Sequence, residues 1–458
     1  KDKMEIIQSI IGFFIAIGIL VTFHEYGHFI TARLFNVTVL NFSIGFGKSI
    51  YKYQPRSSNT EYSIGLIPLG GYVKMLESDE LEKIDKKNEF FDKEFCFDKQ
   101  KVWKRFLIVA AGPVFNLILA FLFFIFVHMN GMNGLKPLVG SFGDLKDPIF
   151  DNNSIVEITE VNNIETKRWQ DVRVEVLNAV VEGDKKIDFL VRSNAGERKI
   201  LSVKVNEDIL KKDGDVIKNI GIVQMNPELS TTISYVQNNS PASLAGFQID
   251  DEIISIDDSP VRTWNEYVQI IHNNPGNILQ VGILRNNERI DLILVPSLKD
   301  INGKKIGFAG ISPTRKNLDM YKVNVKYNFI DSINKSVALT IDYTVLTLKM
   351  IIKLFTGQAN VNNLSGPLSI AEFSGKSLSM GLVYFVYLMA ILSISLGVLN
   401  LLPIPLLDGG HLVYYTFEMI SGKPVSLKIQ LIAQQIGIII LFGVMILAFY
   451  NDFLRIFK

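Results

Sequence analysis

The residues best suited to chemistry form one short pattern, His24-Glu25-Tyr26-Gly27-His28. On an α-helix, residues four apart lie on one face, so both imidazoles can bind the same cation, with Glu25 beside them. A zinc ion held in this way lowers the pKa of bound water towards 7 and polarises a peptide carbonyl. Glu25 is the candidate general base, which takes the proton of that water and later delivers it to the leaving amine. The pattern predicts metal-assisted peptide hydrolysis with His24 and His28 as metal ligands.

A catalytic zinc site needs a third protein ligand besides these two histidines. Asp408 is the only carboxylate in or beside the apolar stretch that ends near it, and Pro403 and Pro405 interrupt the helical pattern just before it. The prolines free backbone polar groups that protein or water must satisfy. Asp408 is therefore the predicted third ligand. His411 is an alternative ligand, although a supporting role suits it better, and ligand types alone do not separate zinc from other divalent ions.

Four apolar stretches without charged residues must position these groups, and they cover about residues 6–23, 106–127, 380–407 and 432–450. Each reaches the roughly 18 residues typical of a membrane-spanning helix. The first and third spans would run in the same direction, so the histidine pair and Asp408, each at the far end of its span, would lie at similar depth. Ionisable groups at membrane depth are functional candidates by default.

Four spans put both termini on one side of the membrane. Lysine and arginine residues cluster beside the spans in the segment between residues 33 and 105, and the positive-inside rule places that segment in the cytoplasm. The termini and the long segment 130–379 would then face outward.

The composition agrees with a membrane protein that carries soluble domains. Of the 458 residues, 48% are hydrophobic and 20% charged, with a net charge of +1. This balance excludes intrinsic disorder and the strongly basic character of a nucleic-acid-binding protein. The single cysteine, Cys96, excludes an intrachain disulfide and a cysteine-rich metal site.

Between the first two spans, the sequence predicts short strands close to the membrane. Residues 37–44, 50–53 and 62–75 are rich in β-branched and aromatic residues and are punctuated by glycines. Residues 77–101 mix both charges and are typical of a solvated connector.

The outward segment contains an internal repeat. Val161-Asn162-Asn163 and Trp169 recur as Ile256-Asp257-Asp258 and Trp264, at an offset of 95 residues. Two units of this size can each hold a small core, and they resemble tandem PDZ domains. β-rich spacers without ligands are the alternative interpretation. Residues 321–355 show apolar positions at helical spacing among lysines, which indicates an amphipathic helix on the membrane surface or an exposed helical linker.

Taken together, these motifs resemble the site-2 protease family of intramembrane zinc metalloproteases over nearly the whole chain. The matching segments are His24–His28 for HExxH, Leu407-Asp408-Gly409 for LDG, Ser43–Gly47 and Pro68–Val73 for the membrane-proximal β region, Ala111–Asn116, and Asn362–Pro367.

The resemblance implies a bacterial inner-membrane enzyme that cuts transmembrane segments of single-span proteins during envelope stress, namely a trimmed anti-sigma factor and signal-peptide remnants. It implies Zn²⁺ on His24, His28 and Asp408, with Glu25 as catalytic base. The PDZ domains would lie in the periplasm and exclude bulky substrates. Asn400 and Asn116, with Ile64, Gly70 and Gly71 of the β region, are expected to handle substrate. Beside the resemblance, there is a physical reason: strand edges within residues 38–75, including the strand of Ile64, and the amides around Asn400 can pair with an extended peptide. Relatives often carry a further asparagine where this chain has Ser393 and Ser395.

The predicted fold class is a multi-pass α-helical membrane protein with four transmembrane helices, a membrane-proximal β region and two tandem PDZ-like β-rich domains. The predicted segments are a first transmembrane helix at 4–33, the cytoplasmic β region and connector at 34–104, a second transmembrane helix at 105–128, PDZ-like domains at 134–225 and 226–315, membrane-surface helices and a loop at 319–379, a third transmembrane helix with the metal-ligand motif at 380–411, and a fourth at 430–451.

Two other classes of function fit parts of the sequence. A membrane scaffold could bind peptide tails through its PDZ-like units, with a vestigial histidine cluster. A transporter could line an ion path with Asp408, Asn116 and Asn400. Zinc content and the effect of Glu25→Gln on cleavage separate these alternatives from a protease.

Overall fold

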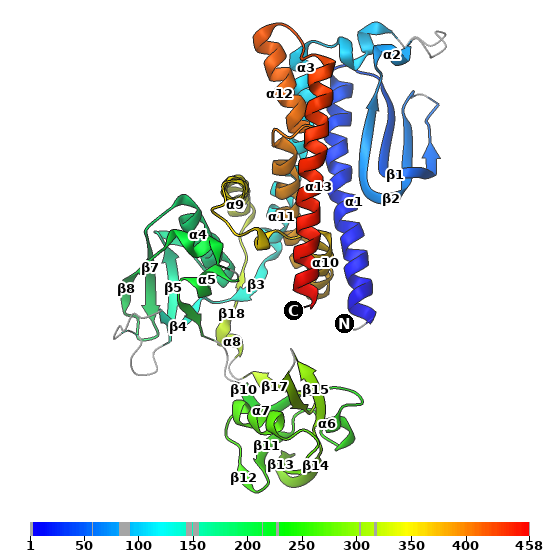
Figure 1. Cartoon of the computed structure of the whole chain (residues 1–458). Coiled ribbons are helices and arrows are strands. Elements are labelled where there is room, and N and C mark those ends of the chain that lie inside the picture. Colours follow the sequence, from blue (N-terminus) through cyan, green and yellow to red (C-terminus); the bar gives the residue numbers. More distant parts are fainter. Residues whose placement is uncertain are drawn as a thin grey trace.

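The structure of the chain is a computed structural model, and Figure 1 shows long helices side by side, with a β-sheet at one end and two β-rich domains at the other. It describes residues 3–56, 58–81, 92–142, 149, 155–212, 214–225, 229–301, 304–315 and 318–457.

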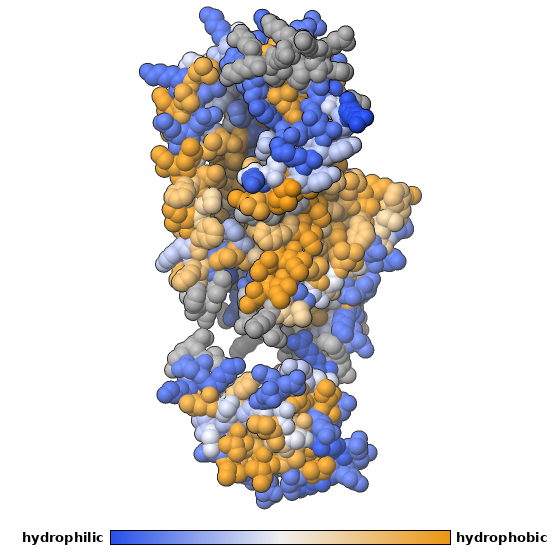
Figure 2. Space-filling model, turned by 90° about the vertical axis from the view of Figure 1, so that its right-hand side faces the viewer, coloured by the Kyte–Doolittle hydropathy of each residue, from blue (hydrophilic) through white to orange (hydrophobic). Residues whose placement is uncertain are grey.

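Four helices in the described part of the chain are long and apolar enough to cross a membrane. They are α1 (Lys3–Leu34), α3 (Val102–Asn130), α11 (Leu382–Leu401) and α13 (Leu427–Phe457). Their apolar side chains form a band across the middle of the molecule, with hydrophilic surfaces above and below it (Figure 2). Both termini lie at the end of the bundle nearest the β-rich domains (Figure 1).

The stretch expected to form one helix at 380–411 is divided in two. α11 ends at Leu401, and a new helix, α12 (Asp408–Ser421), begins at Asp408. Pro403 and Pro405 lie in the connection, where their missing backbone N–H groups prevent a continuous helix. The prediction of a broken end is confirmed, but the sequence did not predict α12 as a helix in its own right.

The β region is a folded hairpin of two long strands, β1 (Val39–Tyr53) and β2 (Glu61–Met75). Residues 41–44 of β1 lie between two parts of β2, because they pair with 71–74 on one side and with 61–64 on the other. Residues 71–75 therefore form an edge of the sheet in the described part of the chain. The connector contains α2 (Ser78–Leu81) and the 3₁₀ turns η1 (Lys93–Phe95) and η2 (Phe97–Lys99), and its residues 82–91 lie outside the described residues.

The two β-rich domains share one topology, with strand order β8-β7-β5-β4-β9 in the first and β14-β13-β11-β10-β17 in the second. The first contains β4 (Leu138–Phe142), β5 (Val156–Val161), β6 (Ile164–Glu165), α4 (Trp169–Glu182), β7 (Lys186–Ser193), β8 (Arg198–Lys204), η4 (Glu207–Lys211), α5 (Val216–Asn219) and β9 (Ile222–Gln224). The second contains β10 (Leu229–Val236), α6 (Pro241–Leu244), β11 (Glu252–Ile256), β12 (Ser259–Pro260), α7 (Trp264–Asn273), β13 (Leu279–Arg285), β14 (Glu288–Leu294), β15 (Ser297–Ile301), β16 (Lys304–Phe308) and β17 (Ile311–Arg315).

The repeat noted in the sequence marks equivalent turns of the two domains. Asn162 and Asn163 follow β5, and Asp257 and Asp258 follow β11, all with positive φ angles between 47° and 66°. Asparagine and aspartate tolerate this left-handed conformation better than other side chains. The tryptophan at the second anchor starts α4 in the first domain and α7 in the second.

The first β-rich domain is fastened to the bundle by α9 (Phe329–Phe355). Leu346 of α9 and Ala359 after it belong to the buried core of that domain, and Lys349 forms an ion pair with Glu182 of α4 at 2.8 Å. α9 also touches the end of α3, where Ser336 Oγ lies 2.9 Å from His128 Nδ1. The buried core of the second domain draws on residues 233–311 alone, as far as the described residues reach.

The helix expected over 321–355 begins later than predicted. Residues 322–325 form strand β18 (Lys322–Val325), which follows α8 (Leu318–Tyr321) and pairs with β3 (Met132–Leu135), and the helix starts only at Phe329. Asn328 caps that start by accepting a hydrogen bond from Asp331 N.

The C-terminal end of α13 is joined to α10 (Pro367–Met380) and to the 3₁₀ turn before it, η5 (Val361–Asn363). The buried carboxylate of Asp452 accepts hydrogen bonds from the backbone amides of Gly366, Leu368 and Ser369. It thus satisfies the free N–H groups at the start of α10 and holds the two helices together.

Candidate metal centre

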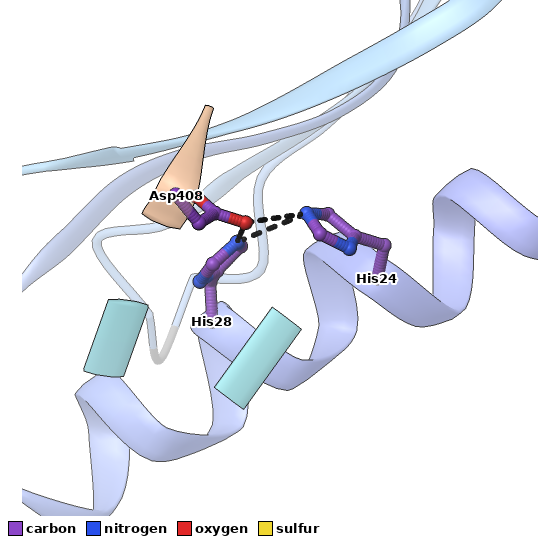
Figure 3. A group of neighbouring side chains, drawn as sticks. All are labelled: His24, His28 and Asp408. Carbon is purple, nitrogen blue, oxygen red and sulfur yellow. Dashed lines mark hydrogen bonds and ion pairs between the residues drawn. The ribbon is translucent and has the colours of Figure 1, made fainter. Parts of the chain in front are cut away.

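The predicted ligands meet towards the end of the bundle nearest the β1–β2 sheet. His24 and His28 project from one face of α1, and Asp408 reaches them from the start of α12 (Figure 3). Asp408 Oδ2 lies 3.1 Å from His24 Nε2 and 3.4 Å from His28 Nε2, and the two Nε2 atoms are 3.3 Å apart. Three ligand atoms from residues almost 400 positions apart therefore converge on one point.

The spacing of these three atoms suits a tetrahedral metal ion. Zinc–ligand bonds of about 2.0–2.1 Å place neighbouring ligand atoms at about 3.3 Å from one another. Asp408 Oδ2 is shielded from solvent and makes no regular hydrogen bond, and both histidines are 8% exposed. A buried carboxylate oxygen that lies beside two imidazole nitrogens is well satisfied by a cation. In the part of the chain that the structure describes, this is the one such group of metal-binding side chains.

A backbone carbonyl sets the tautomer of His28. Its Nδ1 lies 2.9 Å from the carbonyl oxygen of Ile108 in α3. Since a carbonyl can only accept, Nδ1 carries the proton and the lone pair of Nε2 points towards Asp408. This is the tautomer that a metal ligand needs.

Gly112 allows α3 to approach both imidazoles. A Cβ atom at this position would lie 2.3 Å from His28 Nε2 and 2.9 Å from His24 Cε1. Any side chain there would occupy the space in which the ligand nitrogens lie. Gly112 was part of a motif in the sequence, but its role was not predicted, because only the tertiary structure shows which side of α3 faces α1.

A tight connection presents Asp408. Leu406 has a φ angle of 115°, which is rare for a residue with a side chain and costs about 1–3 kcal/mol. The following glycines tuck against the end of α11, since a Cβ at Gly409 would lie 2.1 Å from the carbonyl oxygen of Leu402 and one at Gly410 2.7 Å from that of Ile404. Strain of this kind persists where the surrounding structure holds it and is frequent at functional sites.

A cavity of about 900 Å³ opens beside the three ligands. Glu25 lines it next to β2, where a Cβ at Gly71 would lie 2.9 Å from Glu25 Cγ. Further lining comes from α11, α12, α13, β2 and the residues just after β2, through residues such as Asn400, His411, Leu441, Gly70, Tyr72, Val73, Lys74, Met75 and Glu77. Burial and the nearby carboxylate of Asp98 raise the pKa of Glu77, which also lines this cavity.

The remaining predicted residues divide into two groups. Asn400, Gly70 and Gly71 line the cavity, which is where a residue that handles substrate must lie. Ile64 lies elsewhere, because its backbone pairs with Ile44 and Tyr51 inside the sheet and so offers no free edge. Asn116 is completely buried behind His24 and faces that imidazole instead of the cavity. The positions of these last two residues do not support direct contact with substrate.

His411 lies one turn after Asp408 on α12 and lines the cavity, but it is not part of the group of converging ligand atoms. Its ring packs near those of Tyr414 and Tyr415. Of the two ligand alternatives drawn from the sequence, the geometry favours Asp408.

Comparison with known proteins places the chain in a family. The model of "Peptidase family M50" matches residues 12–444. The chain belongs to peptidase family M50. Similar proteins include "Regulator of sigma-E protease RseP" from Escherichia coli strain K12, 37% identical over 459 residues, and "Regulator of sigma E protease" from Haemophilus influenzae, 36% identical over 467 residues. Each alignment covers 99% of this chain and 100% of the relative.

A third similar protein, from Vibrio cholerae, carries a zinc metalloprotease name and is 34% identical over 458 residues. A solved PDZ domain of an SdrC-like protein from Listeria monocytogenes aligns with 22% of the chain and 99% of its own length, at 17% identity and a TM-score of 0.17, which supports no argument about fold. Membership of M50 confirms the predicted family and makes this chain a metalloprotease.

Proposed function

We propose that this chain is an intramembrane zinc endopeptidase of the site-2 type, which hydrolyses peptide bonds in the transmembrane segments of single-span proteins. The observation that carries this proposal is the meeting of His24, His28 and Asp408 at the spacing of zinc ligands, at the end of an apolar helix bundle and beside a cavity that Glu25 lines.

The residues divide the chemical work between binding and proton transfer. Zinc bound by His24, His28 and Asp408 would polarise the scissile carbonyl and acidify a water molecule. Glu25 takes a proton from that water as the water oxygen attacks the carbonyl carbon. It then gives the proton to the amine nitrogen as the C–N bond breaks. The apolar helices around the cavity limit the entry of other water.

The exposed edge of β2 is the proposed binding site for the substrate backbone. A peptide bond within a helix is poorly accessible, so the substrate must unwind, and its free backbone groups cost several kcal/mol each in an apolar site. Residues 71–75 pair with β1 on one side only and line the cavity on the other. An extended peptide paired with this edge would pass Gly71, where the strand comes close to Glu25.

The outer domains are proposed to filter substrates by size. Both β-rich domains lie at the opposite end of the bundle from the β1–β2 sheet (Figure 1). With the sheet in the cytoplasm, as the positive-inside rule suggests, these PDZ-like domains lie in the periplasm of a bacterial inner membrane. Substrates already trimmed outside, such as an anti-sigma factor, and signal-peptide remnants fit this arrangement. We place the enzyme in envelope stress signalling, and the name of the Escherichia coli relative, a regulator of sigma-E, supports a role in the sigma-E pathway.

Coexpression of the enzyme with a truncated single-span protein tests the proposal. We expect wild-type protein to cut the substrate within its membrane segment, whereas Glu25→Gln protein should retain zinc and leave the substrate intact. Mapping the cut site by mass spectrometry and measuring zinc in both purified proteins provide the readouts. Equal cutting by both proteins, or a cut outside the membrane segment, would contradict the proposal.

A further inference from the structure

Asn116 lies behind His24 in the packed interior where α1, α3 and α11 meet. It is 0% exposed, and its side-chain amide is 3.0 Å from His24 Nδ1, on the side of the imidazole opposite Asp408. A side chain in this place cannot reach a substrate in the cavity. It can act on the reaction only through the imidazole that it touches.

The two atoms at the end of this amide have different consequences for His24. When the amide nitrogen faces the ring it donates to Nδ1, the ring proton must then be on Nε2, and Asn116 Oδ1 is left buried without a partner. When the amide is turned by 180°, its oxygen faces the ring instead and accepts a hydrogen bond from Nδ1–H. The amide nitrogen and oxygen are nearly equal in size and can exchange positions, so hydrogen bonding decides between the two arrangements.

The neighbouring ligand indicates which arrangement suits the metal site. His28 donates its Nδ1 proton to the carbonyl of Ile108 and keeps the Nε2 lone pair free. His24 Nε2 lies 3.3 Å from His28 Nε2 and 3.1 Å from Asp408 Oδ2, so its lone pair must also point there if it is to bind a cation. That requires the proton on Nδ1 and an acceptor beside it.

We infer that Asn116 is a positioning residue for the metal ligand His24: its amide oxygen accepts the Nδ1 proton and so holds the imidazole in the tautomer and orientation that present Nε2 to the metal. Partners of this kind orient the ligands of metal sites, and their loss typically weakens metal binding by about 10- to 100-fold. The inference rests on the proposed function, because it assumes that His24 binds a metal.

α11 holds Asn116 in place. Ser393 Oγ donates a 2.7 Å hydrogen bond to the backbone carbonyl of Asn116. One turn further along α11, Gly397 lets the two helices approach, since a Cβ there would lie 3.0 Å from the carbonyl oxygen of Pro113 and 3.3 Å from Asn116 Cβ. Ser393 therefore contacts the support of the metal site, and it is not among the residues that line the cavity.

Zinc affinity of the purified full-length protein, measured by competition with a chelator, tests this inference. We expect Asn116→Leu to weaken zinc binding by about 10- to 100-fold, because leucine has a similar size but no acceptor. Asn116→Asp should keep binding close to that of wild type, because a carboxylate oxygen accepts the same proton. Asn451→Leu is the matched control. Asn451 is also a buried asparagine, 5% exposed, but it lies in α13 and donates to the backbone carbonyls of Val361 and Leu364 instead of contacting a metal ligand.

The results separate this inference from the proposed function. If wild-type protein binds zinc and cleaves substrate while Asn116→Leu binds zinc equally well, the positioning role is refuted and the proteolytic function stands. Equal weakening by Asn116→Leu and Asn116→Asp would refute the role of the amide as acceptor. If wild-type protein binds no zinc, both proposals fall together.

A measurement on the unaltered protein covers the case in which the variants do not fold. Nitrogen-15 NMR of zinc-loaded wild-type protein with labelled histidine reports which ring nitrogen of each imidazole carries a proton, and the chain has five histidines. A proton on Nδ1 of His24 with Nε2 bound to zinc supports the inference. A His24 ring that carries its proton on Nε2 overturns it.

Discussion

Replacement of Gly112 by alanine probes whether the close approach of α3 to α1 creates the metal centre. The added methyl carbon would lie 2.3 Å from His28 Nε2 and 2.5 Å from His28 Cε1. Carbon contacts normally stay above about 3.5 Å, so the imidazole must move by about 1 Å or the helices must separate. His28 cannot move freely, because its other nitrogen bonds Ile108 at 2.9 Å.

The magnitudes make zinc affinity the decisive measurement for Gly112→Ala. Overpacking costs about 1–3 kcal/mol and a lost hydrogen bond about 1 kcal/mol, whereas alanine gains about 1 kcal/mol over glycine in a helix. Stability should therefore fall only modestly. Zinc affinity should fall by at least the roughly 10- to 100-fold typical of a disturbed ligand, because a ligand nitrogen itself is displaced.

Zinc affinity by chelator competition, with cleavage of a single-span substrate alongside, provides the assay for Gly112→Ala. Gly18→Ala is the control, because Gly18 lies in the same bundle and a Cβ there meets nothing within 4 Å. We expect the control to bind zinc and cleave like wild type. Wild-type zinc affinity and full cleavage in Gly112→Ala would refute the argument that this glycine makes room for the ligands.

Three further predictions concern the sheet edge and the first β-rich domain. Neighbouring residues of an edge strand point their N–H groups in opposite directions, so only one of Tyr72 and Val73 directs its N–H to the free edge. We expect the proline variant at that residue, Tyr72→Pro or Val73→Pro, to reduce cleavage while zinc content and melting temperature stay unchanged. Full cleavage by both variants would contradict edge pairing. Arg168 is buried and forms a 2.7 Å ion pair with Asp171 next to the bundle. Arg168→Ala should therefore speed limited proteolysis of the first β-rich domain and increase cleavage of a substrate that carries a folded domain outside the membrane. Unchanged rates of proteolysis and of substrate cleavage would argue against a rigidly held domain that filters substrates. Burial raises the pKa of Asp215, but hydrogen bonds from Arg173 and the Ile217 amide outweigh it and lower the pKa below its ordinary value. The stabilisation of the folded domain by the ionised Asp215 carboxylate is thus present at neutral pH and is lost as pH falls through the ordinary aspartate range and below. In Asp215→Asn, the stability of the domain should therefore depend less on pH. Acid unfolding followed by Trp169 fluorescence measures this, in a protein whose other two tryptophans are replaced by phenylalanine.

Local patterns were enough to predict most of the elements. The four apolar helices follow from runs of uncharged residues, because a helix is the economical way to satisfy backbone groups in lipid. The repeat anchored at Trp169 and Trp264 corresponds to two sheets with the same strand order. The start of α9 was misplaced because residues 322–325 pair with β3, almost 200 residues away, and such a partner leaves no local signal.

The chemistry was determined largely by the sequence itself. Two histidines four apart on a helix and a lone aspartate after two prolines identify the ligand types without any knowledge of the fold. The tertiary structure decided the rest: that the three ligand atoms lie 3.1–3.4 Å apart, that the free strand edge is at 71–75 and not at Ile64, and that Asn116 faces His24. The physical reason is that residue types and spacing along one helix are local properties. The side of α3 that meets α1, by contrast, depends on how every helix of the bundle packs.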